Sequence, residues 1–272
     1  MPDLSRRGFL ASLPAATTWG VLAASSRPAA SIGSPAQAAA PALSPVFPRV
    51  DDALVSTFVG LCHRDVVEVT RLVERQPSLA RSSWDWGFGD WETGLGAAAH
   101  TGRRNIAEVL FAHGARPTIF SAAMMGQLDV VKAFVAASPG IQGTLGPHGL
   151  PLMLHARAGG KDAEPVVAYL EAVGGADVRP PSAPLEAADR AALVGTYVFG
   201  PGERDRFEVD VRNDQLGMLR PGTTRRFLIH AGDLVFFPSG VPSVRIAFAR
   251  EGGKIARLTI ADPDVFVTAA RR

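Results

Sequence analysis

The fold of the middle of this chain is decided by residues 93–115, which read TGLGAAAHTGRRNIAEVLFAHGA. Small and apolar residues follow one another here at helical spacing, first before Gly102 and again before Gly114. Glycine permits a tight turn at both positions, since it adopts backbone conformations that other residues avoid. The stretch therefore predicts two short helices that meet at one glycine and are closed by another.

Weaker copies of this helix pair occur on both sides of it. The copy at 122–135 turns at Gly126 and the copy at 156–177 turns at Gly159, so the two turn glycines lie 33 residues apart. A degenerate copy near the start of the helical region has Asp65 in place of the glycine. Four such units are enough to bury a continuous core, with the first and the last acting as caps.

With these helix pairs and the spacing of 33 residues between Gly126 and Gly159, the region 51–178 resembles the ankyrin repeat family, whose repeats have the same period. The resemblance implies a short α-solenoid of ankyrin-like helix pairs, which is a scaffold for recognition. Equivalent inner-helix positions of the four units should then line a concave groove. These positions hold His63, His100, Met124 and Arg157.

The spacing of the units departs from the period in one informative place. From Asp65 to Gly102 is 37 residues, whereas from Gly102 to Gly126 is only 24. The longer connection contains WDWGFGDWE at 84–92, which holds all three tryptophans that follow residue 38. Tryptophan is favoured at binding hot spots. The loop is therefore the best local candidate for a binding surface, and the alternative is a hydrophobic lid over the short second unit.

Beyond residue 190 the pattern changes from helical to alternating. Strand-like runs occupy 196–199, 206–211, 226–229, 234–237, 244–248 and 255–260. With its opening LVGTY at 193–197, this region resembles the small β-domain appended to exported bacterial serine hydrolases. The predicted fold class is therefore α+β multidomain, a short α-solenoid of ankyrin-like helix pairs followed by a small antiparallel β-meander or half-barrel.

The N-terminus has the pattern of an export signal. SRRGFL at 5–10 resembles the twin-arginine motif, an apolar stretch follows, and AQA at 36–38 is a candidate cleavage site. We expect a twin-arginine signal peptide at 1–38 and a periplasmic or otherwise exported protein. The further expected boundaries are a linker at 39–50, the repeat domain at 51–178, a proline-rich linker at 179–190 and the β-domain at 191–272.

Charge and cysteine content limit the partners. Without residues 1–38 the chain has 25 basic and 25 acidic residues, so no broad field attracts nucleic acid. Cys62 is the only cysteine, so no internal disulfide is available. The apolar stretch of the signal is too weak for a membrane span. We expect no nucleic acid, no membrane span and no cofactor, and the sequence leaves the oligomeric state open.

The function that these features favour is non-catalytic protein recognition in the bacterial cell envelope. The partner, of unknown identity, would bind through the groove and the tryptophan-rich loop. The residues predicted to form this surface are Trp84, Trp86, Phe88, Asp90, Trp91, His63, His100, Met124 and Arg157. One alternative is a small-ligand or glycan-binding protein that uses the aromatic loop or the β-domain. Another is an unrecognised hydrolase with carboxylates at Asp85, Asp90 and Glu92.

Three further groups of residues have both a functional and a simpler structural interpretation. His63 and His100 occupy equivalent positions of adjacent units and could suggest a metal, but no third ligand is evident, so ordinary groove histidines and no metal are expected. His148 lies in a later finger, where turn packing and ligand contact are equally plausible. Arginines of the β-domain could bind an anion, although a solvated face is the simpler interpretation. These arginines are Arg204, Arg206, Arg225 and Arg226.

Overall fold

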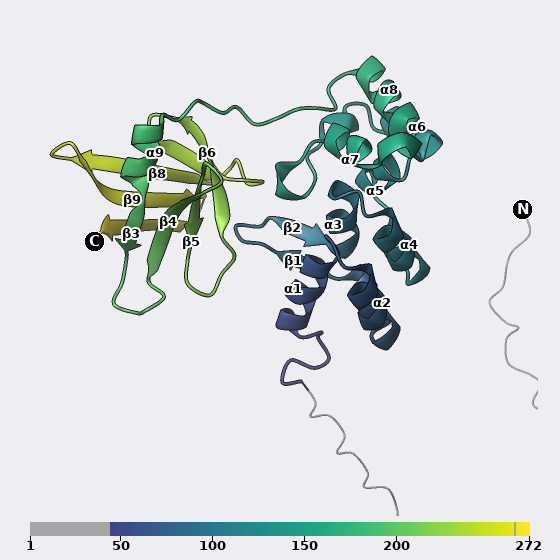
Figure 1. The fold of residues 1–272 in the computed structure, drawn as a ribbon, viewed down its shortest axis with the longest axis horizontal. Coiled ribbons are helices and arrows are strands. Elements are labelled where there is room, and N and C mark those ends of the chain that lie inside the picture. The colour runs from purple at the N-terminus through teal and green to yellow at the C-terminus, as the bar shows by residue number, and fades with distance from the viewer. Residues whose placement is uncertain (1–43, 264) are drawn as a thin grey trace, which may run out of the picture. The chain divides into compact units, whose positions relative to one another are not determined.

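The computed structural model describes residues 44–263 and 265–272, in which helices come first and strands second (Figure 1). Residues 44–272 form one unit. The predicted export signal lies outside the described residues, as does the first part of the predicted linker. In the part of the chain that is described, no helix has the length and apolar character needed to cross a membrane.

Eight α-helices lie between residues 52 and 173, and consecutive helices pack against each other in pairs. They are α1 (Asp52–Leu61), α2 (Val66–Arg75), α3 (Gly94–His100), α4 (Arg104–Ala112), α5 (Ile119–Met124), α6 (Leu128–Ala137), α7 (Leu152–Ala158) and α8 (Glu164–Val173). Four 3-10 turns lie among them, namely η1 (Pro77–Arg81), η2 (Ile141–Gly143), η3 (Pro147–Gly149) and η4 (Gly160–Ala163).

Turn glycines set how closely successive helix pairs approach. Gly102 has φ +68°, and a Cβ at this position would lie 2.3 Å from the carbonyl oxygen of Ala158. Gly126 has φ +72°, and its Cβ would lie 2.2 Å from the carbonyl oxygen of Asp162. Two independent reasons favour glycine at both positions: the backbone is left-handed, and a later segment lies too close to leave room for a Cβ.

A two-stranded sheet interrupts the helices and carries the tryptophan-rich loop. Strands β1 (Ser83–Asp85) and β2 (Trp91–Thr93) pair antiparallel, with Trp84 opposite Glu92. The hydroxyl of Thr93 accepts a hydrogen bond from the backbone N–H of Gly96 at 2.9 Å and so caps α3. This cap fixes the point at which β2 ends and α3 begins, and therefore the position of Glu92 relative to His100.

The C-terminal strands close into an eight-stranded antiparallel barrel. The strands are β3 (Gly195–Val198), β4 (Arg206–Arg212), β5 (Gln215–Leu219), β6 (Arg226–Gly232), β7 (Val235–Pro238), β8 (Arg245–Glu251), β9 (Lys254–Asp262) and β10 (Val265–Arg271). Each strand pairs with its neighbours along the chain, and β10 pairs with β3 through Ala270–Val198 and Arg271–Tyr197. Helix α9 (Ala187–Leu193) precedes the barrel, and Leu193 is buried in its core.

The predicted fold class is wrong. The chain is not a short solenoid followed by an open meander, because the strands form a closed barrel. The prediction missed two strands of the barrel. The first is β5, which contains Gly217 and lies between two turn signals, and the second is β10, whose short alternation gives a weak strand pattern. Since β10 pairs with both β9 and β3, omitting it removes the closure of the barrel.

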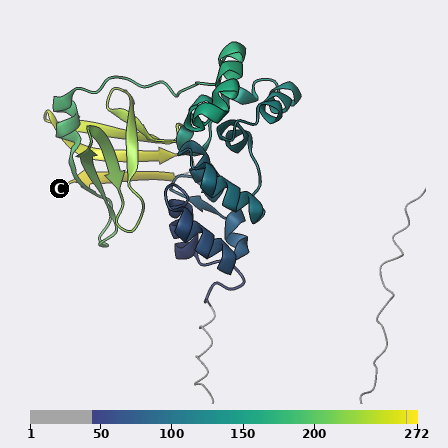
Figure 2. The same ribbon diagram turned by 45° about the vertical axis from the view of Figure 1, so that its right-hand side comes forward.

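The loop between β1 and β2 lies against one end of the barrel (Figures 1 and 2). Phe88, at the tip of this loop, packs against the hydrophobic core of the barrel. It has φ +60°, a conformation that is rare for a bulky residue. The helices and the barrel therefore meet at the segment that the sequence singled out, and this is where polar residues gather.

Candidate metal centre

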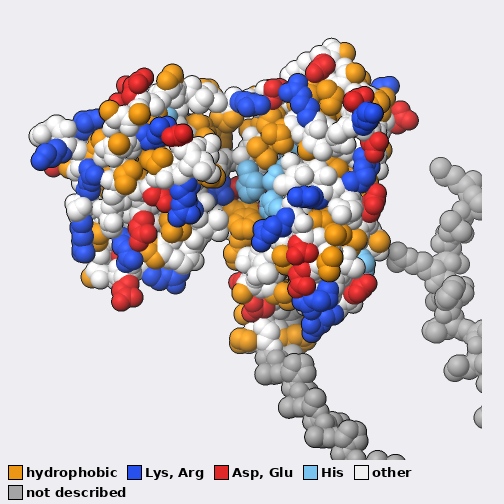
Figure 3. Space-filling model, in the orientation of Figure 1, with side chains coloured by type: hydrophobic (Ala, Val, Ile, Leu, Met, Phe, Trp, Pro, Cys, Tyr) orange, Lys and Arg blue, Asp and Glu red, His pale blue; other side chains and the backbone are white. Residues whose placement is uncertain are grey.

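Three histidines and a glutamate from four separate segments converge beside this loop. His63 follows α1, Glu92 lies in β2, His100 ends α3 and His148 lies in η3. One nitrogen or oxygen of each residue lies within 4.8 Å of the corresponding atom of every other residue. We call these four residues the His/Glu cluster. Histidine side chains are visible together in the hollow between the helices and the barrel (Figure 3).

Glu92 is the centre of the His/Glu cluster, and its side chain is 0 % exposed. Its Oε1 lies 2.9 Å from Nε2 of His100 and 3.4 Å from Nε2 of His148. Its Oε2 lies 3.4 Å from Nε2 of His63 and accepts a hydrogen bond from the indole Nε1 of Trp86 at 2.7 Å. All three imidazoles therefore present the same nitrogen, Nε2, to one buried carboxylate.

The orientation of His63 is fixed by the backbone of α1. Its Nδ1 lies 3.1 Å from the carbonyl oxygen of Val59 and 3.2 Å from that of Gly60. Since a carbonyl oxygen can only accept, Nδ1 carries the proton. Burial lowers the pKa of His63 more than the charge of Glu92 raises it, so the ring is neutral at pH 7. Its Nε2 faces the carboxylate of Glu92.

His148 is held by Asp90, which precedes β2. Its Nδ1 lies 2.8 Å from Oδ2 of Asp90, and its backbone N–H donates to Oδ1 of the same carboxylate at 2.9 Å. The backbone of His148 has φ +60°, a left-handed conformation uncommon for a residue other than glycine. A carboxylate that binds the outer nitrogen of a histidine is the usual support of a metal ligand, because it fixes the ring and its tautomer.

Two separations within the His/Glu cluster match the edge of a tetrahedral zinc site, whereas Nε2 of His100 lies at hydrogen-bond distance, 2.9 Å, from Oε1 of Glu92. Ligand atoms 2.0–2.1 Å from a zinc ion lie roughly 3.4 Å from one another at the edges of a tetrahedron. The Nε2 atoms of His63 and His148 both lie 3.4 Å from a Glu92 oxygen. A charge-assisted hydrogen bond between such groups would be shorter, about 2.7–2.9 Å. These two separations are also compatible with the edge of a coordination shell.

The charges around the His/Glu cluster are strongly coupled. Burial would raise the pKa of Glu92, but the hydrogen bonds from His100 and His148 lower it to about 2. Burial would lower the pKa of His148, but the hydrogen bonds to Asp90 and Glu92 raise it to about 9. Burial also opposes ionisation of Asp90, yet its bonds to His148 and Arg226 leave its pKa below the ordinary value. Both carboxylates are ionised at neutral pH.

Comparison with protein-family models, with curated proteins and with solved structures finds no match for this chain. The interpretation of the cluster therefore depends on its geometry.

Several of the residues predicted to bind a partner lie in or beside the His/Glu cluster. His63 and His100 are members of it, Trp86 donates to Glu92, and Asp90 orients His148. Asp85 lies apart from them and accepts a hydrogen bond from the backbone N–H of Gly87 at 2.8 Å.

The other predicted residues are dispersed. Met124 is fully buried in the core of the helices, and Arg157 is exposed and pairs with Glu171 at 3.4 Å. Trp84 is half-buried against the first helices, whereas Trp91 is 61 % exposed. The equivalent positions along the helices therefore do not form one row of exposed side chains.

The sequence singled out Glu92 as a candidate carboxylate and His148 as a possible ligand contact, but it placed neither residue beside His63 and His100. Glu92 directly precedes the helix that ends at His100, and its burial could not be read from an acidic loop. His148 lies 48 positions beyond His100, in a turn of irregular backbone. One signal was available: His63, His100 and His148 all lie at or next to predicted turns.

Proposed function

We propose that this protein binds a divalent transition-metal ion of the zinc class through His63, Glu92, His100 and His148. The single observation that carries the proposal is the convergence of the Nε2 atoms of all three histidines on the buried Glu92 carboxylate, with one ligand atom of each of the four residues within 4.8 Å of the others. A divalent cation bound among these atoms would take one of them from each residue as a ligand.

The donor set agrees with the type of metal. Three imidazole nitrogens and one carboxylate oxygen suit zinc and its neighbours in the first transition row, whereas calcium and magnesium take oxygen ligands. Two of the three histidines have their outer nitrogen bound to an acceptor, His63 to backbone carbonyls and His148 to Asp90. This is the arrangement that prepares Nε2 as the ligand.

Metal binding by the protein stripped with a chelator tests the proposal. We expect one Zn²⁺ or Co²⁺ per chain by calorimetry and elemental analysis. His100→Ala and Glu92→Gln should each weaken binding by more than about 100-fold, the upper end of the effects seen when only a supporting residue is removed. His113→Ala is the matched control, because the Nδ1 of His113 contacts its own helix at Val109 and lies outside the cluster.

Two results would contradict the proposal. The first is a wild-type protein that binds no more metal than His100→Ala. The second is an equal loss in His113→Ala, since this would point to adventitious binding by histidines in general.

A second candidate function is recognition of a protein partner in the cell envelope, and the exposure of Trp91 favours it. An exposed tryptophan in a short strand is the kind of side chain that anchors an interface. Trp91→Ala should abolish capture of a specific envelope protein by the immobilised chain, and Trp91→Phe should retain part of it. Equal recovery by wild type and Trp91→Ala would exclude this surface.

A further inference from the structure

Two hollows meet beside the His/Glu cluster. The first, which we call the groove, has a volume of about 640 Å³ and is lined by His63 and His148 among others. The second, which we call the barrel mouth, has a volume of about 260 Å³ and opens at the end of the barrel under Phe88. Trp86, Thr224 and Arg226 line both hollows, so the groove and the barrel mouth share a wall.

The groove reaches the exposed side of the His/Glu cluster. The side chains of His63 and His148 are 23 % and 25 % exposed, and both line the groove, whereas Glu92 is 0 % exposed. An ion held by the four residues would therefore face the groove. Zinc and related ions expand to five ligands when a further oxygen is supplied, and the groove is the side from which that oxygen can come.

Three arginines line the groove. Arg225 is paired with Asp210 and Arg226 with Asp90, so among the described residues Arg64 is the lining cation without a carboxylate partner. In the described ranges, the partner found for the Arg64 guanidinium is a carbonyl oxygen, that of Gly60, at 3.3 Å from Nη1. Arg226 is more than nine-tenths buried, and its Nε has no hydrogen-bond partner among the described residues. Arginine recognises carboxylates through several nitrogens at once.

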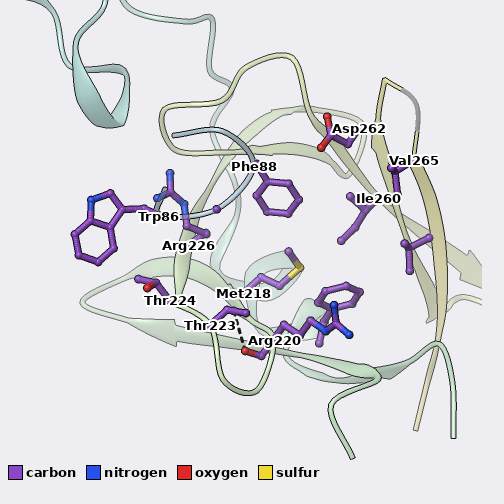
Figure 4. A pocket seen from close by; sticks show the side chains of 13 residues that line it. Trp86, Phe88, Met218, Arg220, Thr223, Thr224, Arg226, Ile260, Asp262 and Val265 are labelled. Carbon is purple, nitrogen blue, oxygen red and sulfur yellow. Dashed lines mark hydrogen bonds between the residues drawn. The ribbon is translucent and has the colours of Figure 1, made fainter. Parts of the chain in front are cut away.

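The barrel mouth is mostly apolar, although Arg220, Arg226 and Asp262 also line it. Its walls include Phe88, Phe207, Met218 and Ile260, and Figure 4 shows Phe88 pointing toward the last two of these residues. In the same view Trp86 lies on the other side of Arg226, at the boundary with the groove. A closed barrel of eight strands is wide enough to hold one small ligand.

We propose that the groove and the barrel mouth together bind a small monocarboxylate with an apolar body. Its carboxylate binds beside Arg64 as a fifth ligand on the groove side of the metal ion, and its hydrocarbon chain enters the barrel mouth. The inference rests on the proposed metal centre, which supplies the charge that the carboxylate binds.

The test uses the protein loaded with Co²⁺, whose visible spectrum reports ligands of the metal. Acetate, butanoate and octanoate are titrated in turn, with inorganic phosphate as a second kind of anion. Each methylene buried in the barrel mouth should improve binding about fourfold. We therefore expect octanoate to change the spectrum and to bind at least about a hundredfold more tightly than acetate, a gain that phosphate lacks.

Two variants separate the carboxylate end from the chain end. Arg64→Gln should weaken acetate and octanoate by the same factor and leave Co²⁺ binding unchanged. Val267→Phe, which narrows the barrel mouth, should weaken octanoate and not acetate. If Val267→Phe does not fold, the affinities of the wild-type protein for acetate, butanoate and octanoate still test whether the hydrocarbon chain is buried.

The two proposals fail in different ways. Absence of a Co²⁺ spectrum overturns the metal centre and this inference with it. A normal Co²⁺ spectrum that octanoate leaves unchanged overturns this inference alone. Binding of acetate or phosphate as tight as that of octanoate would also overturn this inference and leave the metal centre standing.

Discussion

The Asp90 carboxylate and the Arg226 guanidinium form a buried ion pair, 2.5 Å from Oδ2 to an Nη2 nitrogen, although 136 positions separate them in the chain. Asp90 also holds His148, so one carboxylate connects the barrel to the His/Glu cluster. The same guanidinium nitrogen donates to the carbonyl oxygen of Ser239, which anchors the arginine within the barrel.

The first prediction concerns Asp90. Asp90→Asn removes no metal ligand, yet it weakens the acceptor that orients His148 and leaves the buried charge of Arg226 without a counter-ion. We expect metal affinity to fall by about 10- to 100-fold. We also expect the free energy of unfolding to fall by about 3–5 kcal/mol, because one partner of a buried pair is removed. Calorimetry and denaturant unfolding measure the two effects.

Asp85→Asn is the matched control for Asp90→Asn, since Asp85 lies in the same hairpin and its role is a hydrogen bond from the Gly87 backbone. An amide oxygen can accept that bond equally. Restoring stability with the double variant Asp90→Asn/Arg226→Met would show that the lone charge caused the loss. Unchanged metal affinity in Asp90→Asn would contradict the connection between barrel and metal.

The second prediction uses Cys62 as a reporter. The thiol is buried, and burial, assisted by the negative charge of Glu92, raises its pKa. Alkylation should therefore be very slow in the native protein and complete in denaturant. Metal at a hundred times its dissociation constant stabilises the folded state by about 2.7 kcal/mol, so labelling through global unfolding should slow by about 100-fold.

Mass spectrometry after timed alkylation measures this effect, and Glu92→Gln is the control in which the protection by metal should disappear. Rapid labelling of the wild-type protein without denaturant would show that Cys62 is accessible in the folded state. Equal protection of wild type and Glu92→Gln would show that the metal binds elsewhere.

The sequence predicted local features of the fold better than its closure. Turn glycines such as Gly102 and Gly126 could be identified because left-handed backbone leaves few other choices. Six of the strands were visible in alternating runs. Closure of the barrel depends on β10, which pairs with β9 and also with β3, about 70 positions earlier in the chain. Alternation within a short segment does not indicate a pairing between strands so far apart.

The candidate site was predicted in part for a similar reason. Equivalent positions in neighbouring units placed His63 beside His100, and the unusual loop pointed to Trp86 and Asp90. His148 could not be placed, because its approach depends on a left-handed turn and on a bond to Asp90, 58 positions away. A metal site assembled from four segments becomes visible only when their packing is known.

The third prediction compares two turn glycines. Gly114 has φ +81°, and a Cβ there would meet nothing within 4 Å, so Gly114→Ala should cost about 1–2 kcal/mol from backbone strain alone. Gly126→Ala adds a clash with the carbonyl oxygen of Asp162 and should cost about 1–3 kcal/mol more. Denaturant unfolding measures both, and equal losses would contradict the close approach at Gly126.

The fourth prediction concerns alkaline pH and Tyr197. Its hydroxyl is buried and donates to the carbonyl oxygen of Leu193 at 2.7 Å. Burial raises its pKa to about 12, and the charge of Arg271 only partly opposes this. An ordinary tyrosine has a pKa near 10. Between these values the unfolded chain has lost the proton that the folded chain keeps, so stability falls as the pH rises through this window.

Tyr197→Phe should remove that part of the pH dependence. Near pH 8 the variant should be less stable than wild type by about 1 kcal/mol, the value of the lost hydrogen bond. Above about pH 11 wild type loses up to about 3 kcal/mol that the variant keeps, so the order should reverse. Tyr169→Phe is the control, since Tyr169 is only half-buried. Denaturant midpoints at the two pH values measure the difference, and a constant gap between wild type and Tyr197→Phe would show that Tyr197 titrates normally.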